Sequence, residues 1–138
     1  FREAHVWTDD EMDLIREVAE RTWDAVERTR AEAARRESET RFRLMADSLP
    51  LLIWMTDTHG NVEFLNRHWL EYSGATGSAT TAAQIAAESV HPDDAPRLMA
   101  AFGEALRTGK GFEVEQRNRS ATGAYRWFLN RSEPYRDP

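Results

Sequence analysis

Apolar positions in the first third of the chain recur every three or four residues, which is the period of an α-helix. Thr8 and Glu11 have the spacing of a capping box, in which each side chain accepts the backbone N–H of the other residue. No glycine or proline lies between them and Pro50, and the strong helix formers Ala, Glu and Arg are frequent. The pattern predicts one helix from about residue 9 to about residue 46, roughly 55 Å long at 1.5 Å per residue.

Seven positions of this helix alternate at spacings of three and four residues and form a heptad seam. They are Met12, Ile15, Ala19, Thr22, Val26, Thr29 and Ala33. The threonines and alanines make the seam weak, so two interpretations stay open: a solvated single helix packed on a domain, or a parallel two-stranded coiled coil. We favour the coiled coil, which predicts a homodimer through this helix. Trp7 and Trp23 lie off the seam and suggest that residues 1–46 include the tail of an upstream domain.

Residues 51–65 show the period of β-strands. The apolar run at 51–56 and the alternation at 62–64 predict two short strands. Asp57 predicts a type I turn between them, because its carboxylate can accept the N–H groups just ahead, and Gly60 suits the exit of that turn.

Residues 66–89 favour short helices joined by a loop. The side chain of Asn66 can accept an N–H at the start of a helix, and Gly74 can end that helix in the left-handed conformation. A stretch of small residues at 75–83 predicts a loop, and residues 82–89 predict a further short helix.

Residues 91–132 predict a longer helix followed by a hairpin. Asp93 is expected to cap the helix, Asp94 to complement its dipole, and Gly109 to end it. Its apolar stripe consists of Leu98, Met99, Phe102 and Leu106. Alternating patterns at 112–119 and 125–132 predict two antiparallel strands around a turn at 120–123.

Composition narrows the function. No apolar run reaches the roughly 18 residues of a membrane span, and a formal net charge of −6 disfavours a nucleic-acid surface. The chain has no cysteine, which excludes disulfides, thiolate zinc sites and thiol nucleophiles and is compatible with the cytoplasm. We find no phosphate-binding glycine loop, nucleophile elbow or kinase motif. We expect a noncatalytic cytoplasmic module without nucleic-acid or membrane partners.

Four segments of the sequence, in this order and at these separations, resemble a PAS domain, the small α+β sensor fold of bacterial signalling proteins. They are FLNRHWLEYSG at 64–74, HPDD at 91–94, FEVE at 112–115 and YRWF at 125–128. The preceding RESETRFR at 36–43 is similar to the helical lead-in of PAS modules in sensor histidine kinases, and residues 1–30 resemble the last helix of a GAF domain.

The resemblance implies an antiparallel sheet with short helices on one face, preceded by the long N-terminal helix. Residues 1–46 would be the GAF-like tail and signalling helix, and residues 47–138 the PAS domain. A PAS sheet usually has five strands, the last lying between the first and the fourth, and we expect this last strand to be missing from the sequence, which stops where it should begin. The implied function is signal relay in a sensor histidine kinase. The alternatives are an input module of a diguanylate cyclase or other effector, a structural dimerisation spacer, and a metal-dependent hydrolase.

PAS domains hold ligands between the sheet and the helices, which makes six aromatic residues candidates for lining a small-molecule pocket. These are Trp54, Phe64, Trp69, Tyr72, Phe102 and Phe128. Simple core packing also explains them, and we favour it, because aromatic residues in so small a domain have to be buried whatever its function. His91, Asp93 and Asp94 could bind a metal, but a turn and a helix cap account for all three, so we expect no metal. The resemblance disfavours haem, because residues 94–108 lack a histidine, and a flavin adduct, because there is no cysteine.

Overall fold

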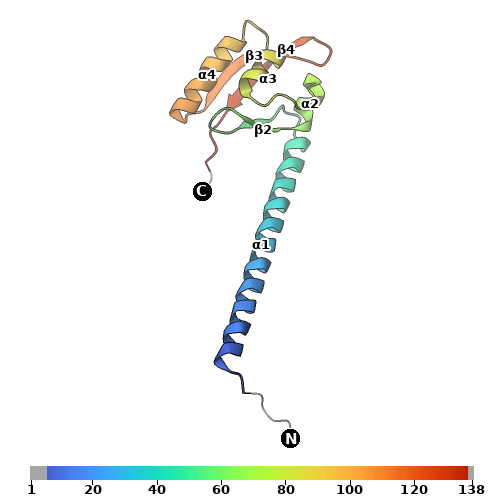
Figure 1. The fold of residues 1–138 in the computed structure, drawn as a ribbon. Helices are drawn as coiled ribbons and strands as arrows, with labels where there is room; N and C mark the ends of the chain where they lie inside the picture. The colour runs from blue at the N-terminus through green and yellow to red at the C-terminus, as the bar shows by residue number, and fades with distance from the viewer. Residues whose placement is uncertain (1–5, 137–138) are drawn as a thin grey trace. The chain divides into compact units, whose positions relative to one another are not determined.

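The computed structural model describes residues 6–136. Residues 1–5 and 137–138, at the ends of the two predicted domains, lie outside the described residues. The chain divides into two compact units, Phe1–Leu44 and Met45–Pro138. The order of elements is one long helix, two strands, three short helices and two strands, as the sequence predicts (Figure 1).

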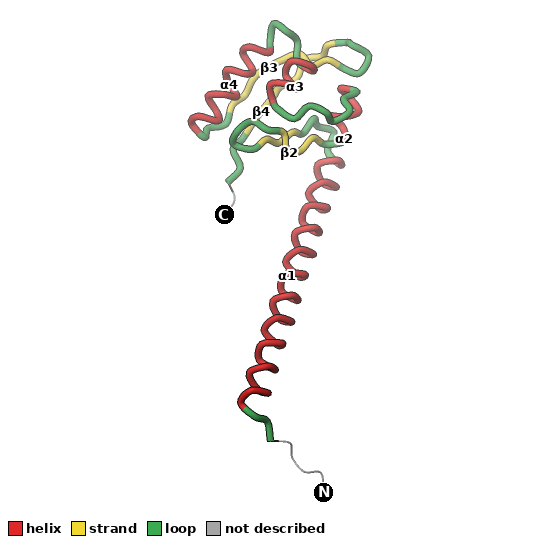
Figure 2. The backbone as a smooth tube through the Cα atoms, in the orientation of Figure 1, coloured by secondary structure: helices red, strands yellow, loops and turns green. Residues whose placement is uncertain are grey.

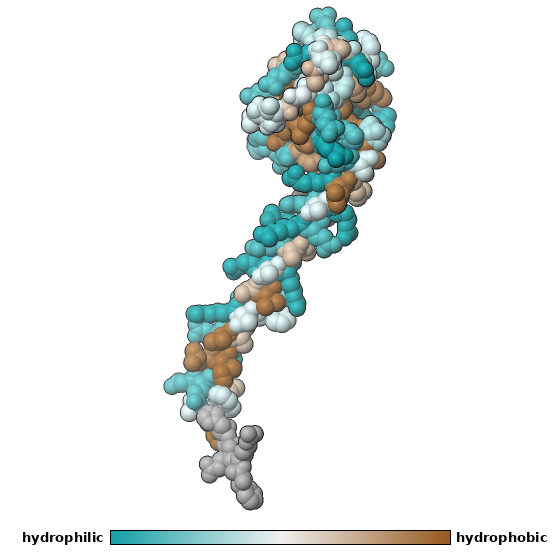
Figure 3. Space-filling model, turned by 90° about the vertical axis from the view of Figure 1, so that its right-hand side faces the viewer, coloured by the Kyte–Doolittle hydropathy of each residue, from teal (hydrophilic) through white to brown (hydrophobic). Residues whose placement is uncertain are grey.

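Helix α1 (Asp9–Ser48) begins with the predicted capping box. The Thr8 N–H donates to Glu11 Oε2 at 2.9 Å, and the Glu11 N–H donates to Thr8 Oγ1 at 3.3 Å. The described side chains of the first unit are exposed almost throughout. Figure 3 shows apolar patches among polar side chains along this helix.

Strands β1 (Trp54–Thr56) and β2 (Val62–Leu65) form an antiparallel pair around the turn that Asp57 is predicted to open. The Asp57 carboxylate accepts the N–H groups of His59 at 2.8 Å and Asn61 at 2.9 Å. The prediction of a strand from residue 51 is wrong in its first half. The chain before β1 is tied to a side chain instead, because the Ile53 N–H donates to Asn66 Oδ1 at 3.0 Å.

Helix α2 (Arg67–Ser73) has the two predicted ends: Asn66 is its N-cap, and Gly74 ends it in the left-handed conformation at φ 67°. Helix α3 (Ala82–Ser89) begins with a second capping box, which Thr81 and Gln84 form. Helix α4 (Ala95–Thr108) ends at the predicted glycine, Gly109, also in the left-handed conformation.

The prediction for the start of α4 is wrong. Asp94, not Asp93, occupies the N-cap position, and it makes no side-chain capping bond. The Asp94 carboxylate instead accepts hydrogen bonds from Arg117 on a distant strand. The charge-assisted pair takes the carboxylate that would otherwise cap the helix.

Strands β3 (Phe112–Arg119) and β4 (Tyr125–Ser132) form the predicted hairpin, paired without a bulge from Phe112↔Ser132 to Arg119↔Tyr125. The strands of the described residues form two separate antiparallel pairs, β1–β2 and β3–β4. Helices α3 and α4 lie over one side of β3–β4 (Figure 2). This side holds the core, in which Ala86, Val90 and Leu98 pack with Phe112.

Three glycines separate the effects of backbone strain and of steric contact on stability. At Gly74 (φ 67°) an added Cβ would lie 2.9 Å from Cβ of Ala121, whereas at Gly77 (φ 77°) it would meet nothing within 4 Å. Gly74→Ala should therefore cost about 1–2 kcal/mol for the left-handed backbone plus about 1–3 kcal/mol for the contact. Gly77→Ala should cost the backbone part alone. Urea unfolding of each variant measures the difference.

Gly103 is the matched control, because it lies inside α4 with open space around it. Gly103→Ala should raise the free energy of unfolding by about 0.4–1 kcal/mol. Equal losses of unfolding free energy for Gly74→Ala and Gly77→Ala would contradict the steric part of this prediction. They would show that the turn at Ala121 moves away from the added Cβ at no cost.

Candidate functional site

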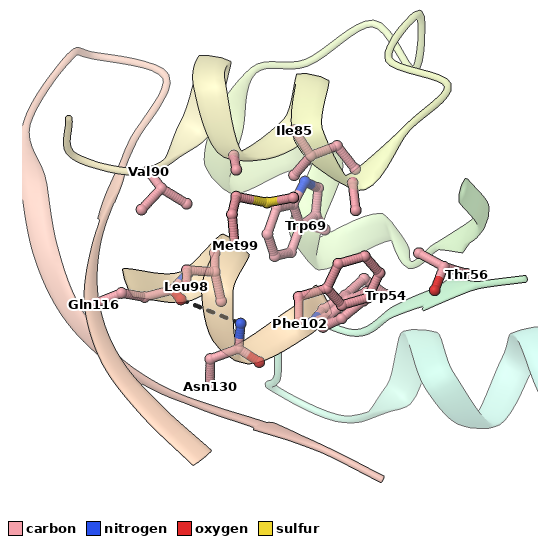
Figure 4. A pocket seen from close by; sticks show the side chains of 12 residues that line it. Trp54, Thr56, Trp69, Ile85, Val90, Leu98, Met99, Phe102, Gln116 and Asn130 are labelled. Carbon is pink, nitrogen blue, oxygen red and sulfur yellow. Dashed lines mark hydrogen bonds between the residues drawn. The ribbon is translucent and has the colours of Figure 1, made fainter. Parts of the chain in front are cut away.

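A small apolar cavity lies between β1, the three short helices and the hairpin (Figure 4). Its volume is about 30 Å³, space for about two or three water molecules at about 10–15 Å³ each. None of the described residues that line it is ionisable. They are Trp54, Thr56, Trp69, Ala82, Ile85, Ala86, Val90, Leu98, Met99, Phe102, Gln116 and Asn130.

The hairpin contributes a polar wall to this cavity. Gln116 is 1% exposed; its Nε2 donates to Asn118 Oδ1 at 2.8 Å, and its Oε1 accepts from Asn130 Nδ2 at 3.2 Å. The dashed line in Figure 4 marks the second bond. Buried amides need partners, and this row of carboxamides supplies them internally. The arrangement can present hydrogen-bonding groups to a guest without any charge.

Three of the six predicted pocket residues line the cavity: Trp54, Trp69 and Phe102. The ring of Phe102 meets that of Trp54 edge to face at 5.8 Å. Tyr72 and Phe128 pair edge to face at 5.2 Å and line a different, open groove. Phe64 lines neither of these spaces.

The open groove has a volume of about 950 Å³ and runs between the chain around β1 and strand β4. Its walls come from residues 50–54, from α2 and from the hairpin. Trp54, Trp69, Gln116 and Asn130 line both spaces, so only a few side chains separate the cavity from the groove.

Sequence reasoning missed most of the small cavity-lining residues, such as Ala82 and Ala86, because alanine carries no signal beyond helix propensity. Gln116 and Asn130 could have been found from the alternation of the hairpin. Gln116 shares a strand face with Phe112 and Val114, and Asn130 lies opposite Val114.

The candidate metal cluster has a structural explanation. His91 Nδ1 accepts the N–H of Asp93 at 3.1 Å, and Asp94 binds both Nε and Nη2 of Arg117 at 2.9 Å. Among residues 6–136 no group of three or more His, Asp or Glu side chains is arranged to hold a metal. The hydrogen bonds from Arg117 hold the pKa of Asp94 well below its usual range.

The same cluster fastens the hairpin to α4. The backbone N–H of Arg117 also donates to Asp94 at 2.9 Å, and the His91 N–H donates to the carbonyl of Arg117 at 2.8 Å. On the exposed face of the sheet, the guanidinium of Arg117 lies 5.0 Å from the ring centre of Trp127. Asp94 is therefore a structural residue.

The fold and its cavity together define a class: a small α+β domain with an internal site between sheet and helices. Comparison with known proteins identifies the family, because the model of the PAS fold matches residues 62–138. The chain belongs to the PAS family. PAS domains are sensory, not catalytic, so this chain is a signal-sensing module.

Three curated relatives support this assignment. Uncharacterized protein y4lL of Sinorhizobium fredii is 32% identical over 80% of this chain. Hybrid signal transduction histidine kinase H of Dictyostelium discoideum is 28% identical over 72%, and peroxide stress-activated histidine kinase mak1 of Schizosaccharomyces pombe is 30% identical over 69%. The chain spans only 13%, 10% and 6% of the lengths of these relatives.

A solved structure is also similar: the PAS domain of the quorum-sensing receptor RpfR from Cronobacter turicensis, in complex with C12:0. It aligns with a TM-score of 0.51 at 26% sequence identity, over 61% of this chain and 81% of that one. Within residues 6–136, no helix combines the length and the apolar character needed to cross a membrane.

The lowered pKa of Asp94 predicts acid sensitivity. The folded state stabilises the ionised form of the Asp94 carboxylate, and the unfolded chain does not. The resulting contribution to the free energy of unfolding is present above the usual pKa of about 3.9. It is lost as the pH falls below that value. Asp94→Asn should therefore lower the melting temperature at pH 7 and should flatten its decline between about pH 4 and pH 2.

Asp93→Asn is the matched control, since the Asp93 side chain is 78% exposed. It should change the melting temperature little at either pH. A melting curve of Asp94→Asn that keeps the acid dependence of the wild type would mean that other carboxylates, such as Asp57, dominate it.

Proposed function

We propose that this chain is the sensory and signal-relay module of a bacterial two-component sensor histidine kinase. The observation that carries the proposal is the coincidence of two findings: relatives named as histidine kinases and an internal apolar cavity with a polar wall. In this proposal the remaining domains of the parent protein supply the kinase activity.

We propose the domain boundaries that the sequence indicates. Residues 1–46 would be the tail of an upstream GAF-like domain and a signalling helix, and residues 47–138 the PAS domain. The open groove is the proposed place of a fifth strand. β1 and β4 each have one strand neighbour in the described residues, so an added strand there could pair with both free edges and join the two sheets.

The alternative is that the parent protein has another output, such as a diguanylate cyclase. The similarity to the PAS domain of a quorum-sensing receptor favours this alternative, because PAS modules serve receptors as well as kinases. The location in the cytoplasm stays a prediction from the sequence.

The proposed ligand is a small molecule enclosed by the cavity. The volume of about 30 Å³ is too small for most ligands, so the cavity must widen as it fills. The proposed contacts are the cavity-lining aromatics Trp54, Trp69 and Phe102, and on the groove side Tyr72 and Phe128. Phe64 is the weakest of the predicted candidates, because it lines neither space.

Native mass spectrometry of the purified chain should show a bound small molecule, and added dodecanoic acid is a defined probe for calorimetry. Ala86→Val places extra volume in the cavity at a residue that is 3% exposed. By occupying space that the ligand would need, the added methyl groups should weaken binding by about tenfold, which is about 1.4 kcal/mol.

The neighbouring exposed residue provides the control: Ala87→Val should leave the affinity unchanged. Equal affinities for both variants would place the ligand outside the cavity. A chain with neither a co-purified molecule nor any affinity for dodecanoic acid would favour the structural spacer.

The proposed dimer forms through the heptad seam of α1. Three seam residues leave large apolar side chains exposed: Met12 at 44%, Ile15 at 45% and Val26 at 39%. Both seam threonines satisfy their hydroxyls within the helix, since Thr22 donates to the Val18 carbonyl at 2.8 Å and Thr29 to the Ala25 carbonyl at 2.9 Å. Because these hydroxyls already have partners, they need none from another chain. The threonines can therefore face a second helix with their methyl groups in an apolar seam.

Ile15→Glu combined with Val26→Glu should convert the dimer to a monomer, because the charges would face each other across the seam. Light scattering coupled to size-exclusion chromatography measures the change. Val18→Glu is the control, at a residue that is 55% exposed and off the seam. A dimer that survives the double substitution would contradict the seam, and one lost with Val18→Glu would shift it to another face.

A further inference from the structure

The last turn of α1 is bonded to the first turn of α2. The backbone N–H of Arg67 donates to Asp47 Oδ1 at 2.7 Å, and Ala46 is 4% exposed. A carboxylate at this position also complements the positive end of the α2 dipole. Both partners belong to the unit Met45–Pro138, so the end of α1 is part of the PAS fold.

Asn66 makes four hydrogen bonds at the same junction and has no exposed surface. Its Oδ1 accepts the N–H groups of Ile53 at 3.0 Å and Trp69 at 3.1 Å. Its Nδ2 donates to the carbonyls of Ala46 at 2.9 Å and Leu51 at 2.8 Å. One side chain thus holds the end of α1, the lead-in to β1 and the start of α2.

Helix α2 also reaches the cavity and the hairpin. Trp69, three residues after Asn66, is 6% exposed and lines the cavity (Figure 4). Tyr72 donates its hydroxyl to the carbonyl of Asn118 at 3.0 Å, and its own carbonyl accepts the N–H of Ala121 at 2.6 Å. A helix of seven residues therefore contacts the cavity, the hairpin and α1 at once.

We propose that α2 transmits changes in the cavity to α1, with Asn66 and Asp47 as the positioning residues of this connection. The inference rests on the proposed function, in which the cavity changes its packing when a ligand enters. Repacking that displaces Trp69 must strain or move the Asn66 cap, because both lie on one short helix. The cap in turn holds the carbonyl of Ala46. Coupling of this kind requires an element that both sites bias, and α2 is in contact with both.

The wall that α4 contributes to the cavity lacks this connection. Leu98 on α4 is 8% exposed and lines the cavity. The hydrogen bonds that residues 46 and 47 make outside their own helix go to Asn66 and Arg67, and none among the described residues joins α4 to residues 45–48. The proposal therefore predicts that disturbances of equally buried cavity residues differ in their effect on α1.

Hydrogen exchange of the chain 1–138 tests this prediction without a ligand. Trp69→Phe should speed exchange of the amides of residues 45–48 by about threefold or more, while Leu98→Val, the matched control, should leave it unchanged. Asn66→Ser keeps an oxygen to cap α2 and removes Nδ2, the atom that donates to the carbonyls of Ala46 and Leu51. Adding Trp69→Phe to Asn66→Ser should then leave the exchange rates of residues 45–48 at the values that Asn66→Ser alone gives.

A reciprocal measurement covers the case in which Trp69→Phe does not fold. Coupling between sites acts in both directions. Asp47→Ala should therefore shift the indole N–H resonance of Trp69 in an NMR spectrum, and Asp93→Ala should not.

Three results would overturn the proposal: an effect of Leu98→Val equal to that of Trp69→Phe, an effect of Trp69→Phe that persists with Asn66→Ser, or an indole resonance indifferent to Asp47→Ala. Because none of these measurements uses a ligand, such a failure is distinguishable from the absence of a small molecule in the cavity.

Discussion

The side chain of Asn66 is the interaction on which the arrangement of the PAS unit most depends. A carboxamide can donate two hydrogen bonds and accept two, and Asn66 uses all four on backbone groups of the end of α1, the lead-in to β1 and the first turn of α2. No other side chain of this size can donate two hydrogen bonds from one atom and accept two at another. Aspartate could only accept, so the two carbonyls would lose their donor. Removing the amide leaves several buried backbone groups unpaired, and each costs about 1–3 kcal/mol.

A second fastening, between Asp94 and Arg117, holds the opposite side of the unit together. Asn66 joins the end of α1 to β1 and α2, while Asp94 joins the start of α4 to the hairpin. The cavity lies between these two polar fastenings, and its own walls are held mainly by apolar contact. The fold thus combines rigid polar joints at its borders with an interior that can repack at lower cost. This combination suits a domain whose interior must respond to a guest without unfolding.

The sequence predicted the elements well because their signals are local. Thr8, Asn66, Gly74 and Gly109 each act on the backbone within one helical turn, and all four have the predicted role. The hairpin followed from alternation alone. The start of β1 was predicted wrongly because a distant partner, Asn66, accepts the N–H of Ile53 that the local pattern assigns to a strand. The cap of α4 was predicted one residue too early, and the carboxylate at the true N-cap, Asp94, is bound by Arg117 on a distant strand.

The site was only partly predictable for the same reason. The sequence indicates that an aromatic residue is buried, but which space it borders depends on packing across several elements. Trp54 and Phe64 look alike as candidates in the sequence, yet Trp54 lines the cavity and Phe64 does not. The alanines and carboxamides that line the cavity form no pattern in the sequence from which the cavity could be predicted.

The lack of ionisable groups around the cavity has a chemical consequence for whatever occupies it. An ion enclosed by these walls would give up its hydration without gaining a counter-charge, at a cost of many kcal/mol. A weak acid enclosed there would have to enter in its protonated form, with the carboxamides of Gln116 and Asn130 as candidate hydrogen-bond partners. Occupancy by such a guest would then follow the acidity of the surrounding medium through the titration of the guest, even though no lining residue is ionisable.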